Sequence, residues 1–155
     1  MTAKSLTFRV ATREDLAAIV RMLADDGLGN GREQPADPLP RAYGDAFERM
    51  AAQQGNYYLL AESDGDVAAC LQLTVIHGLS RTGMSRAQIE GVRVAATHRG
   101  QGIGEALFRE AVERARVAGC GLVQLTTDKR RADARRFYER LGFSASHEGM
   151  KLELR

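Results

Sequence analysis

The chain has 155 residues, of which 44% are hydrophobic and 27% are charged. These values are ordinary for one globular domain and exclude a wholly disordered chain. The 22 basic and 20 acidic residues leave a net charge of +2, which is too small to demand a polyanionic partner.

The sequence carries no sign of export, membrane insertion or metal binding. Its N-terminus lacks the apolar centre of a signal peptide, and its longest apolar run, over 67–71, is far shorter than a membrane span. Cys70, Cys120 and the three histidines are scattered and match no zinc motif. We therefore expect a cytoplasmic protein with reduced thiols, no metal and no membrane partner.

The first third of the chain combines one strand with two helices. Leu6, Phe8 and Val10 are separated by polar residues, which is typical of a half-buried strand. The spacing of apolar residues predicts helices over 13–26 and 41–53. All three prolines lie between them, in a loop over 27–40 that is either a lid or binding loop or a plain surface connection.

Strand patterns dominate the middle of the chain, and helices return later. Strands are predicted over 57–62 and 67–76, joined by a tight turn at Asp64-Gly65. A loop over 77–86 and a strand over 89–95 follow. Then come a helix over 102–118, a strand over 122–126, a helix over 132–141 and strands over 143–146 and 150–154.

The element order β-α-α-β-β-β-α-β-α-β-β indicates the fold class. It predicts an α/β (α+β mixed) protein with a central mixed, mostly antiparallel sheet flanked by helices. We expect one domain over 1–155.

Alternate glycines open the helix over 102–118. The segment Arg99-Gly100-Gln101-Gly102-Ile103-Gly104 lets the backbone turn tightly and approach a ligand. The unpaired N–H groups and the dipole of the first helical turn suit a diphosphate. The sequence lacks the lysine of a Walker loop, and the glycine spacing does not fit the dinucleotide fingerprint. The segment therefore predicts a diphosphate site of another type.

The segment R-G-Q-G-I-G resembles the Q/R-x-x-G-x-G/A signature of the GNAT superfamily of N-acetyltransferases. Upstream, I-E-G-V-R-V over 89–94 is similar to the central strand of that family. Downstream, D-A-R-R-F-Y-E-R-L-G-F over 133–143 is similar to its A-x-x-F-Y-E-x-L-G-F block. The resemblance implies transfer of an acetyl group from acetyl-CoA to a primary amine, by direct attack through a tetrahedral intermediate.

The resemblance also implies which residues bind acetyl-CoA. The pyrophosphate is held at Arg99, Gly100, Gln101, Gly102, Ile103 and Gly104. The central strand splays from its neighbour, so the main chain of Val92, Arg93 and Val94 pairs with the pantetheine arm, and an N–H near Val92 binds the oxyanion. Arg131 stands where the family usually has asparagine, and a guanidinium there could reach a phosphate.

Two residues are candidates for proton transfer. Tyr138, in the F-Y-E part of the block, is expected to protonate the leaving thiolate or to hydrogen-bond with it; the alternative is a tyrosine packed at a helix surface. Glu90 precedes Val92 by two, so we expect both side chains on one strand face. Glu90 would take the proton from the ammonium, directly or through water, or would only orient a cationic substrate.

Two other protein classes remain open. Lys129, Arg130, Arg131, Arg135 and Arg136 form a basic cluster, 129–136, which is either a nucleic-acid-binding patch or a solvated helix face. The balanced charge elsewhere makes nucleic acid an unfavoured partner. A non-catalytic acyl-CoA-binding module would keep the glycine loop without turnover.

The acceptor is expected to be a small-molecule or peptide amine. Its specificity should be set by 27–40, 77–86 and the C-terminal hairpin. Four acidic residues near the first loop favour a cationic amine: Asp25, Asp26, Glu33 and Asp37. The resemblance to the family also implies a homodimer.

Overall fold

The computed structural model describes residues 5–154. The chain forms two compact units, of which the first ends at Gln124 and the second begins at Leu125. The described part of the first unit holds one five-stranded sheet, whereas that of the second holds a single helix.

The sheet has the strand order β1-β2-β3-β4-β5. Its strands are β1 (Leu6–Val10), β2 (Asn56–Ser63), β3 (Asp66–Ile76), β4 (Ser85–Val94) and β5 (Cys120–Gln124). The first four are antiparallel to their neighbours, and β5 runs parallel to β4. The mixed, mostly antiparallel sheet is therefore confirmed. The turn at Asp64-Gly65 is also present, with positive φ at both residues, as a tight hairpin requires.

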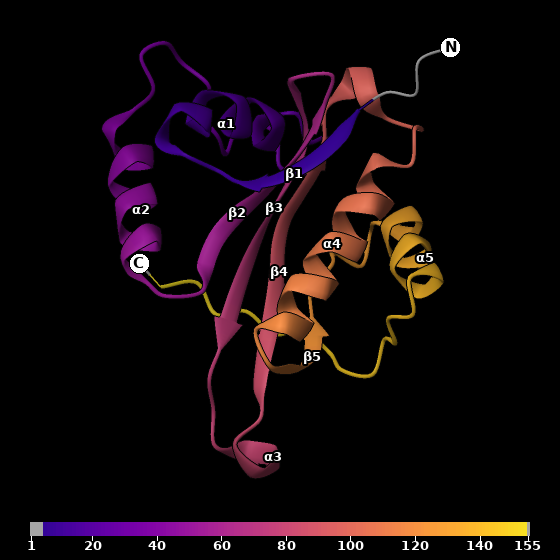
Figure 1. Ribbon diagram of the computed structural model, residues 1–155. Coiled ribbons are helices and arrows are strands. Elements are labelled where there is room, and N and C mark those ends of the chain that lie inside the picture. The colour runs from indigo at the N-terminus through magenta and orange to yellow at the C-terminus, as the bar shows by residue number, and fades with distance from the viewer. Residues whose placement is uncertain (1–4, 155) are drawn as a thin grey trace. The chain divides into compact units, whose positions relative to one another are not determined.

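Helices cover both faces of this sheet. The first unit contains η1 (Arg13–Asp15), α1 (Leu16–Ala24), α2 (Arg41–Ala52), α3 (Ser80–Gly83), η2 (Ala96–His98) and α4 (Ile103–Val117). Figure 1 shows α1 and α4 on opposite faces of the sheet, while α2 packs near β2. Ile19 and Met22 of α1 pack against Leu60 and Cys70.

The predicted apolar stripe of α4 is buried. Leu107, Ala111 and Ala115 recur every four residues, and none is more than 1% exposed. Glu105 and Arg109 pair on the exposed side of the helix, with 2.7 Å between oxygen and nitrogen. The amphipathic pattern therefore explains why this side of α4 packs against the sheet.

A partly buried ion pair between Arg9 and Asp15 fixes the start of the helix that leads into α1. The Asp15 carboxylate accepts hydrogen bonds from Arg9 at 2.7 and 2.9 Å and from the Thr12 main-chain N–H at 2.7 Å. These bonds satisfy a helix N-terminal donor and place negative charge where the helix dipole favours it. The predicted helix over 13–26 is accordingly a 3-10 turn followed by the shorter α1.

Two sequence predictions are wrong. The loop over 77–86 is shorter, because β4 already begins at Ser85: Ser85 pairs with β5, and Arg86 pairs with both β3 and β5. The two final strands are absent, since no strand is present over 143–154. Met150, Leu152 and Leu154 alternate as predicted, yet each is at least 85% exposed. Alternation alone does not make a strand, because the main chain also needs a hydrogen-bonding neighbour.

The second unit contains α5 (Ala132–Arg140), whose C-terminus is closed by Gly142 at φ +94°. The N–H groups of Gly142 and Phe143 donate to the carbonyls of Glu139 and Tyr138, both at 3.0 Å. This pattern of bonds is a Schellman motif. It turns Phe143 back onto the helix.

Candidate functional site

A β-bulge lies in β4 beside Gly91, where β4 has one residue more than the facing part of β3. Glu90 lies opposite Gln72 and Arg93 lies opposite Cys70, so Gly91 and Val92 share one position of the partner strand. Gly91 adopts φ +59°. A Cβ at Gly91 would also lie 3.1 Å from the Tyr58 hydroxyl. The bulge therefore requires glycine for both its backbone conformation and its space.

The bulge overturns one sequence prediction. Glu90 and Val92 do not share a strand face, because the extra residue shifts the alternation of side chains by one position. Glu90 and Arg93 instead lie on the face that carries Cys70 and Gln72. Glu90 is exposed there.

Polar side chains surround Glu90 on this face. The Asn56 side-chain oxygen accepts hydrogen bonds from Gln72 Nε2 at 2.9 Å and from Thr74 Oγ1 at 3.1 Å. Gln72 lies opposite Glu90 in the register. The carboxylate therefore stands beside an ordered amide and hydroxyl network on the sheet.

Tyr58 and the loop over 27–40 lie near the same carboxylate. Burial raises the pKa of Tyr58, and the carboxylates of Glu33 and Glu90 raise it further, against the opposing effect of Arg93. Glu33 is itself held by the Tyr43 hydroxyl at 2.7 Å. The loop thus brings a second carboxylate toward the polar face.

A pocket of about 310 Å³ adjoins this network. Phe47 and Met50 of α2 form part of its lining, together with Asn56, Tyr57 and Tyr58 of β2. Its wall combines apolar side chains with the amide of Asn56, which is the kind of surface that small-molecule sites use.

The pairing between β4 and β5 ends early. The last matched residues are Gln88 and Gln124, although β4 continues to Val94. Within the described part of the first unit, residues 89–94 therefore have a strand partner only on the β3 side. Their other edge offers main-chain donors and acceptors.

The Val92 N–H points away from Cys70. The Cys70 thiol donates to the Gly91 carbonyl across 3.9 Å, and the Arg93 main-chain N–H donates to the same sulfur. A planar trans peptide directs its C=O and N–H in opposite directions, so the Val92 N–H lies on the side opposite to the sulfur. Burial raises the pKa of Cys70 to about 12, which keeps the thiol neutral.

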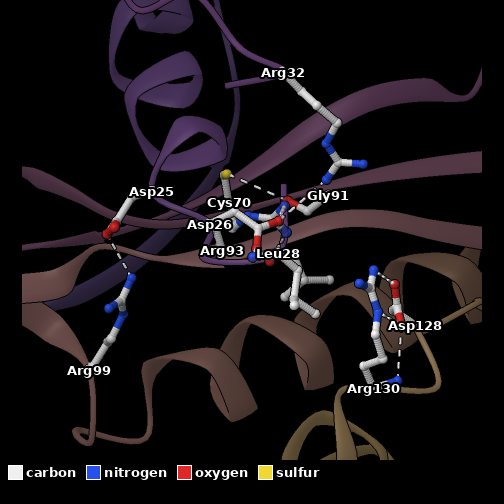
Figure 2. Close-up of polar contacts among 11 residues, drawn as sticks. Asp25, Asp26, Leu28, Arg32, Cys70, Gly91, Arg93, Arg99, Asp128 and Arg130 are labelled. Carbon is white, nitrogen blue, oxygen red and sulfur yellow. Dashed lines mark hydrogen bonds and ion pairs between the residues drawn. The ribbon is translucent and has the colours of Figure 1, made fainter. Parts of the chain in front are cut away.

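Two adjacent aspartates after α1 each hold one arginine of the predicted site (Figure 2). Asp26 is 2.8 Å from Arg93 Nη2 in a pair whose side chains are 3% and 20% exposed. Asp25 is 2.7 Å from Arg99 Nη2 in a pair open to solvent. Arg93 Nη1 also donates to the Val92 carbonyl at 2.8 Å.

The glycine loop has the backbone that its sequence predicts. Gly100 and Gly102 have φ values of +73° and +76°. No other atom of the described chain lies within 4 Å of a Cβ built on either residue. Gly102 caps α4, and the N–H groups of the first turn, from Ile103 onward, begin a helix of 15 residues. This end of α4 is suited to an anion.

The second unit carries Tyr138 and Arg131. The Tyr138 ring lies edge-on to Phe137 and Phe143, with centroid distances of 5.5 and 6.1 Å. Arg131 caps α5, and its N–H donates to the Asp128 carbonyl at 2.9 Å. Arg130 binds Asp128 through its side chain, and this bonding lowers the pKa of the Asp128 carboxyl.

The structure brings most of the predicted residues together within the first unit. Glu90, Val92, Arg93 and Val94 lie on β4, and residues 99–104 follow it after one short turn. The sequence pattern assigned Asp25 and Asp26 to a cationic amine, but in the structure they pair with Arg99 and Arg93 of this chain. Sequence reasoning therefore missed the pairing of Asp26 with Arg93. A signal was present, because acidic residues at a helix C-terminus oppose the helix dipole and imply a cationic partner.

The described residues contain no helix that is long and apolar enough to cross a membrane. The chain matches the family model described as the acetyltransferase (GNAT) family over residues 19–143, and it belongs to that family. It is thus an acyltransferase of the N-acetyltransferase class.

Three similar proteins show the range of the family. Aminoalkylphosphonate N-acetyltransferase of Salmonella typhimurium is 35% identical over 110 residues, which cover 69% of each chain. A crystal structure described as a transcriptional regulator from Bacillus halodurans is 48% identical, with a TM-score of 0.93, over 97% of this chain and 100% of that one. The aminoglycoside N-acetyltransferase AAC(6')-Iy, solved in complex with CoA, shares the fold at 15% identity, with a TM-score of 0.78 over 99% and 97% of the two chains.

Proposed function

We propose that the protein transfers the acetyl group of acetyl-CoA to a primary amine by direct attack through a tetrahedral intermediate. The bulge at Gly91 carries this proposal. It directs the Val92 N–H away from Cys70 on a strand whose outer edge lacks a partner within the described first unit. The glycine-lined start of α4 follows directly in the chain.

Acetyl-CoA would bind along β4 and the loop that follows it. The main chain of Val92, Arg93 and Val94 would pair with the pantetheine arm, as a strand pairs with its neighbour. Residues 99–104 would hold the pyrophosphate at the start of α4. Arg131, at the cap of α5, would supply a further phosphate contact.

The reaction needs a base, an oxyanion donor and an acid. An alkyl ammonium, with a pKa of about 10.4, must lose a proton before it can attack. Glu90 would accept that proton, directly or through one water. The Val92 N–H would stabilise the oxyanion. Tyr138 would protonate the departing thiolate or donate a hydrogen bond to it.

The acceptor would be a small-molecule or peptide amine that carries positive charge. Glu33 and Glu90 both act on Tyr58, so two carboxylates lie near the polar face. The pocket beside Asn56 would hold the rest of the acceptor. The Salmonella relative is named for aminoalkylphosphonates, so small amino compounds are the first acceptors to test. The family resemblance supports a homodimer, and the reduced thiols expected from the sequence support a cytoplasmic location.

Calorimetric titration of the purified protein with acetyl-CoA tests this proposal, with ATP and NADH as controls. We expect selective binding with a Kd of tens of micromolar or tighter, which is about −6 kcal/mol or better. A screen of amines for thiol release would then identify the acceptor. Failure to bind acetyl-CoA would overturn the proposal. Binding without turnover of any amine would favour a non-catalytic acyl-CoA-binding module.

Nucleic-acid binding is the second candidate function, favoured by the name of the Bacillus halodurans relative. The structure weakens the case for the basic cluster, 129–136, as its binding surface. Arg130 pairs with Asp128, Arg135 with Glu139, Arg136 with Asp133 and Lys129 with Glu148. These acids offset much of the positive charge that a polyanion would need. Salt-dependent retention on heparin with no response to acetyl-CoA would support this second candidate.

A further inference from the structure

We propose that Asp26 is a positioning residue for acetyl transfer. It holds the Arg93 guanidinium on the Val92 carbonyl and thereby fixes the peptide groups of the β4 bulge. The inference rests on the proposed function, in which the Val92 N–H meets the oxyanion. It adds a role for a side chain that belongs neither to the glycine loop nor to β4.

A continuous chain of contacts leads from Asp26 to the bulge (Figure 2). Asp26 Oδ2 accepts a hydrogen bond from Arg93 Nη2 at 2.8 Å, and Arg93 Nη1 donates to the Val92 carbonyl at 2.8 Å. Two contacts orient Asp26 itself. Its Oδ1 accepts from the Leu28 N–H at 3.1 Å, and its Oδ2 lies 3.5 Å from Arg32 Nη2. The start of the loop over 27–40 is therefore tied to the bulge.

Stability alone does not explain this arrangement. The Asp26 side chain is only 3% exposed, and it lies after the C-terminus of α1, where the helix dipole disfavours an acid. Arg93 Nε is buried without a hydrogen-bond partner among the described residues. A buried ion pair with an unsatisfied donor is often no more stable than an apolar pair of the same shape. The geometry that the pair imposes on the bulge is therefore the better explanation of its presence.

The bulge is the part of β4 that most needs such a constraint. Glycine has more backbone freedom than any other residue type, so Gly91 restrains the bulge little. Within the described first unit, residues 89–94 also have no strand partner on the side away from β3. Asp26 holds the Arg93 guanidinium, and the guanidinium in turn holds the Val92 carbonyl of the Val92–Arg93 peptide. The Val92 N–H belongs to the preceding peptide, so the constraint reaches it through the backbone angles of Val92 itself. A misdirected N–H would weaken oxyanion stabilisation, whereas the phosphate site at residues 99–104 lies outside the bulge and would keep most of the affinity for acetyl-CoA. The effect should therefore be larger on kcat than on the KM for acetyl-CoA, even though the pantetheine contacts proposed for Val92 and Arg93 lie at the bulge.

Asp26→Asn tests the proposal in the full chain. We expect kcat to fall about 10- to 100-fold, in line with the cost of small misplacements in active sites, while KM for acetyl-CoA changes less than about threefold. Asp15→Asn is the matched control, because Asp15 is also buried and pairs with an arginine, Arg9, away from β4. That control should lower the melting temperature but keep kcat within about twofold per folded molecule.

A double variant separates positioning from folding. Asp26→Asn alone leaves the Arg93 charge buried and only partly paired, which can unfold the protein. Asp26→Asn with Arg93→Met removes both charges and should fold, yet it still lacks the guanidinium on Val92. We expect its kcat to stay low. A kcat within twofold of the Asp15→Asn control, or a loss confined to KM for acetyl-CoA, would overturn the inference. Failure of the proposed function would look different, because the unmodified protein would then show no turnover.

Discussion

The ring of Phe143 lies edge-on to the ring of Tyr138, with their centroids 6.1 Å apart. The contact follows from the end of α5, where the N–H of Phe143 donates to the Tyr138 carbonyl. A contact of this kind commonly accompanies a Schellman motif. The L-G-F residues of the family block, 141–143, therefore shape the end of α5 in this chain. Gly142 turns the backbone so that Phe143 can pack against the candidate acid.

Tyr138→Phe should reduce turnover without weakening acetyl-CoA binding. The substitution removes the hydroxyl but keeps a ring that can contact Phe137 and Phe143. General acid catalysis typically contributes about 10²- to 10⁴-fold, so we expect kcat to fall within that range. Steady-state kinetics and calorimetry with acetyl-CoA measure the two effects. Unchanged kcat would exclude the acid role.

Phe143→Ala should lower kcat while the Tyr138 hydroxyl remains. Loss of the edge-on contact, worth about 0.5–1.5 kcal/mol beyond area burial, frees the Tyr138 ring to adopt other rotamers. We expect a reduction in kcat of about 3- to 10-fold. Phe143→Leu retains apolar bulk and serves as the control, with a smaller loss. Equal losses in the two variants would contradict a role for the ring contact.

Gly91→Ala should impair both stability and activity. The new Cβ would occupy a positive-φ backbone position and lie 3.1 Å from the Tyr58 hydroxyl. We expect a loss of about 1–3 kcal/mol in unfolding free energy, measured by urea denaturation. Gly65→Ala is the control, since Gly65 also has positive φ but lies in the β2–β3 turn. It should destabilise the fold while kcat of the folded fraction stays unchanged.

Asp25→Asn should tighten binding of acetyl-CoA. The Asp25 carboxylate holds Arg99 at 2.7 Å in a pair that is more than half exposed. Such pairs contribute about 0–1 kcal/mol, so freeing the guanidinium for a phosphate should lower Kd by no more than about fivefold. Added salt should shrink the difference between the variant and the parent protein. Weaker binding at low salt would show that Asp25 orients Arg99 for the cofactor rather than competing for it.

Asp15 should make the fold sensitive to acid. Hydrogen bonds from Arg9 lower the Asp15 pKa, against the opposing effect of burial. A lowered pKa contributes stability above the ordinary value of about 3.9, and that contribution is lost as pH falls toward the folded-state value. The unfolding free energies of the parent protein and Asp15→Asn should therefore differ at pH 7 and converge below about pH 4. A constant difference across this range would contradict the linkage.

Local patterns predicted much of the fold but not the geometry of the bulge. The helical stripe through Leu107 and the turn at Asp64-Gly65 depend on spacing within a few residues, and the structure has both. The prediction that Glu90 and Val92 share a strand face was wrong, because the extra residue in β4 can be recognised only from its pairing register with β3. The pairing of Asp26 with Arg93 joins residues 67 apart, which no local pattern encodes.

Within the described first unit, the edge of β4 beyond Gln88 has no strand partner, and this affects the stability of the protein when no substrate is bound. Exposed strand edges are templates for pairing with other chains. If the pantetheine arm lies along Val92, Arg93 and Val94, acetyl-CoA pairs with the sheet like an additional strand and shields that part of the edge. The resistance of the protein to unfolding and aggregation then rises with acetyl-CoA concentration by mass action. The time for which the protein stays folded would therefore increase with the concentration of its own substrate.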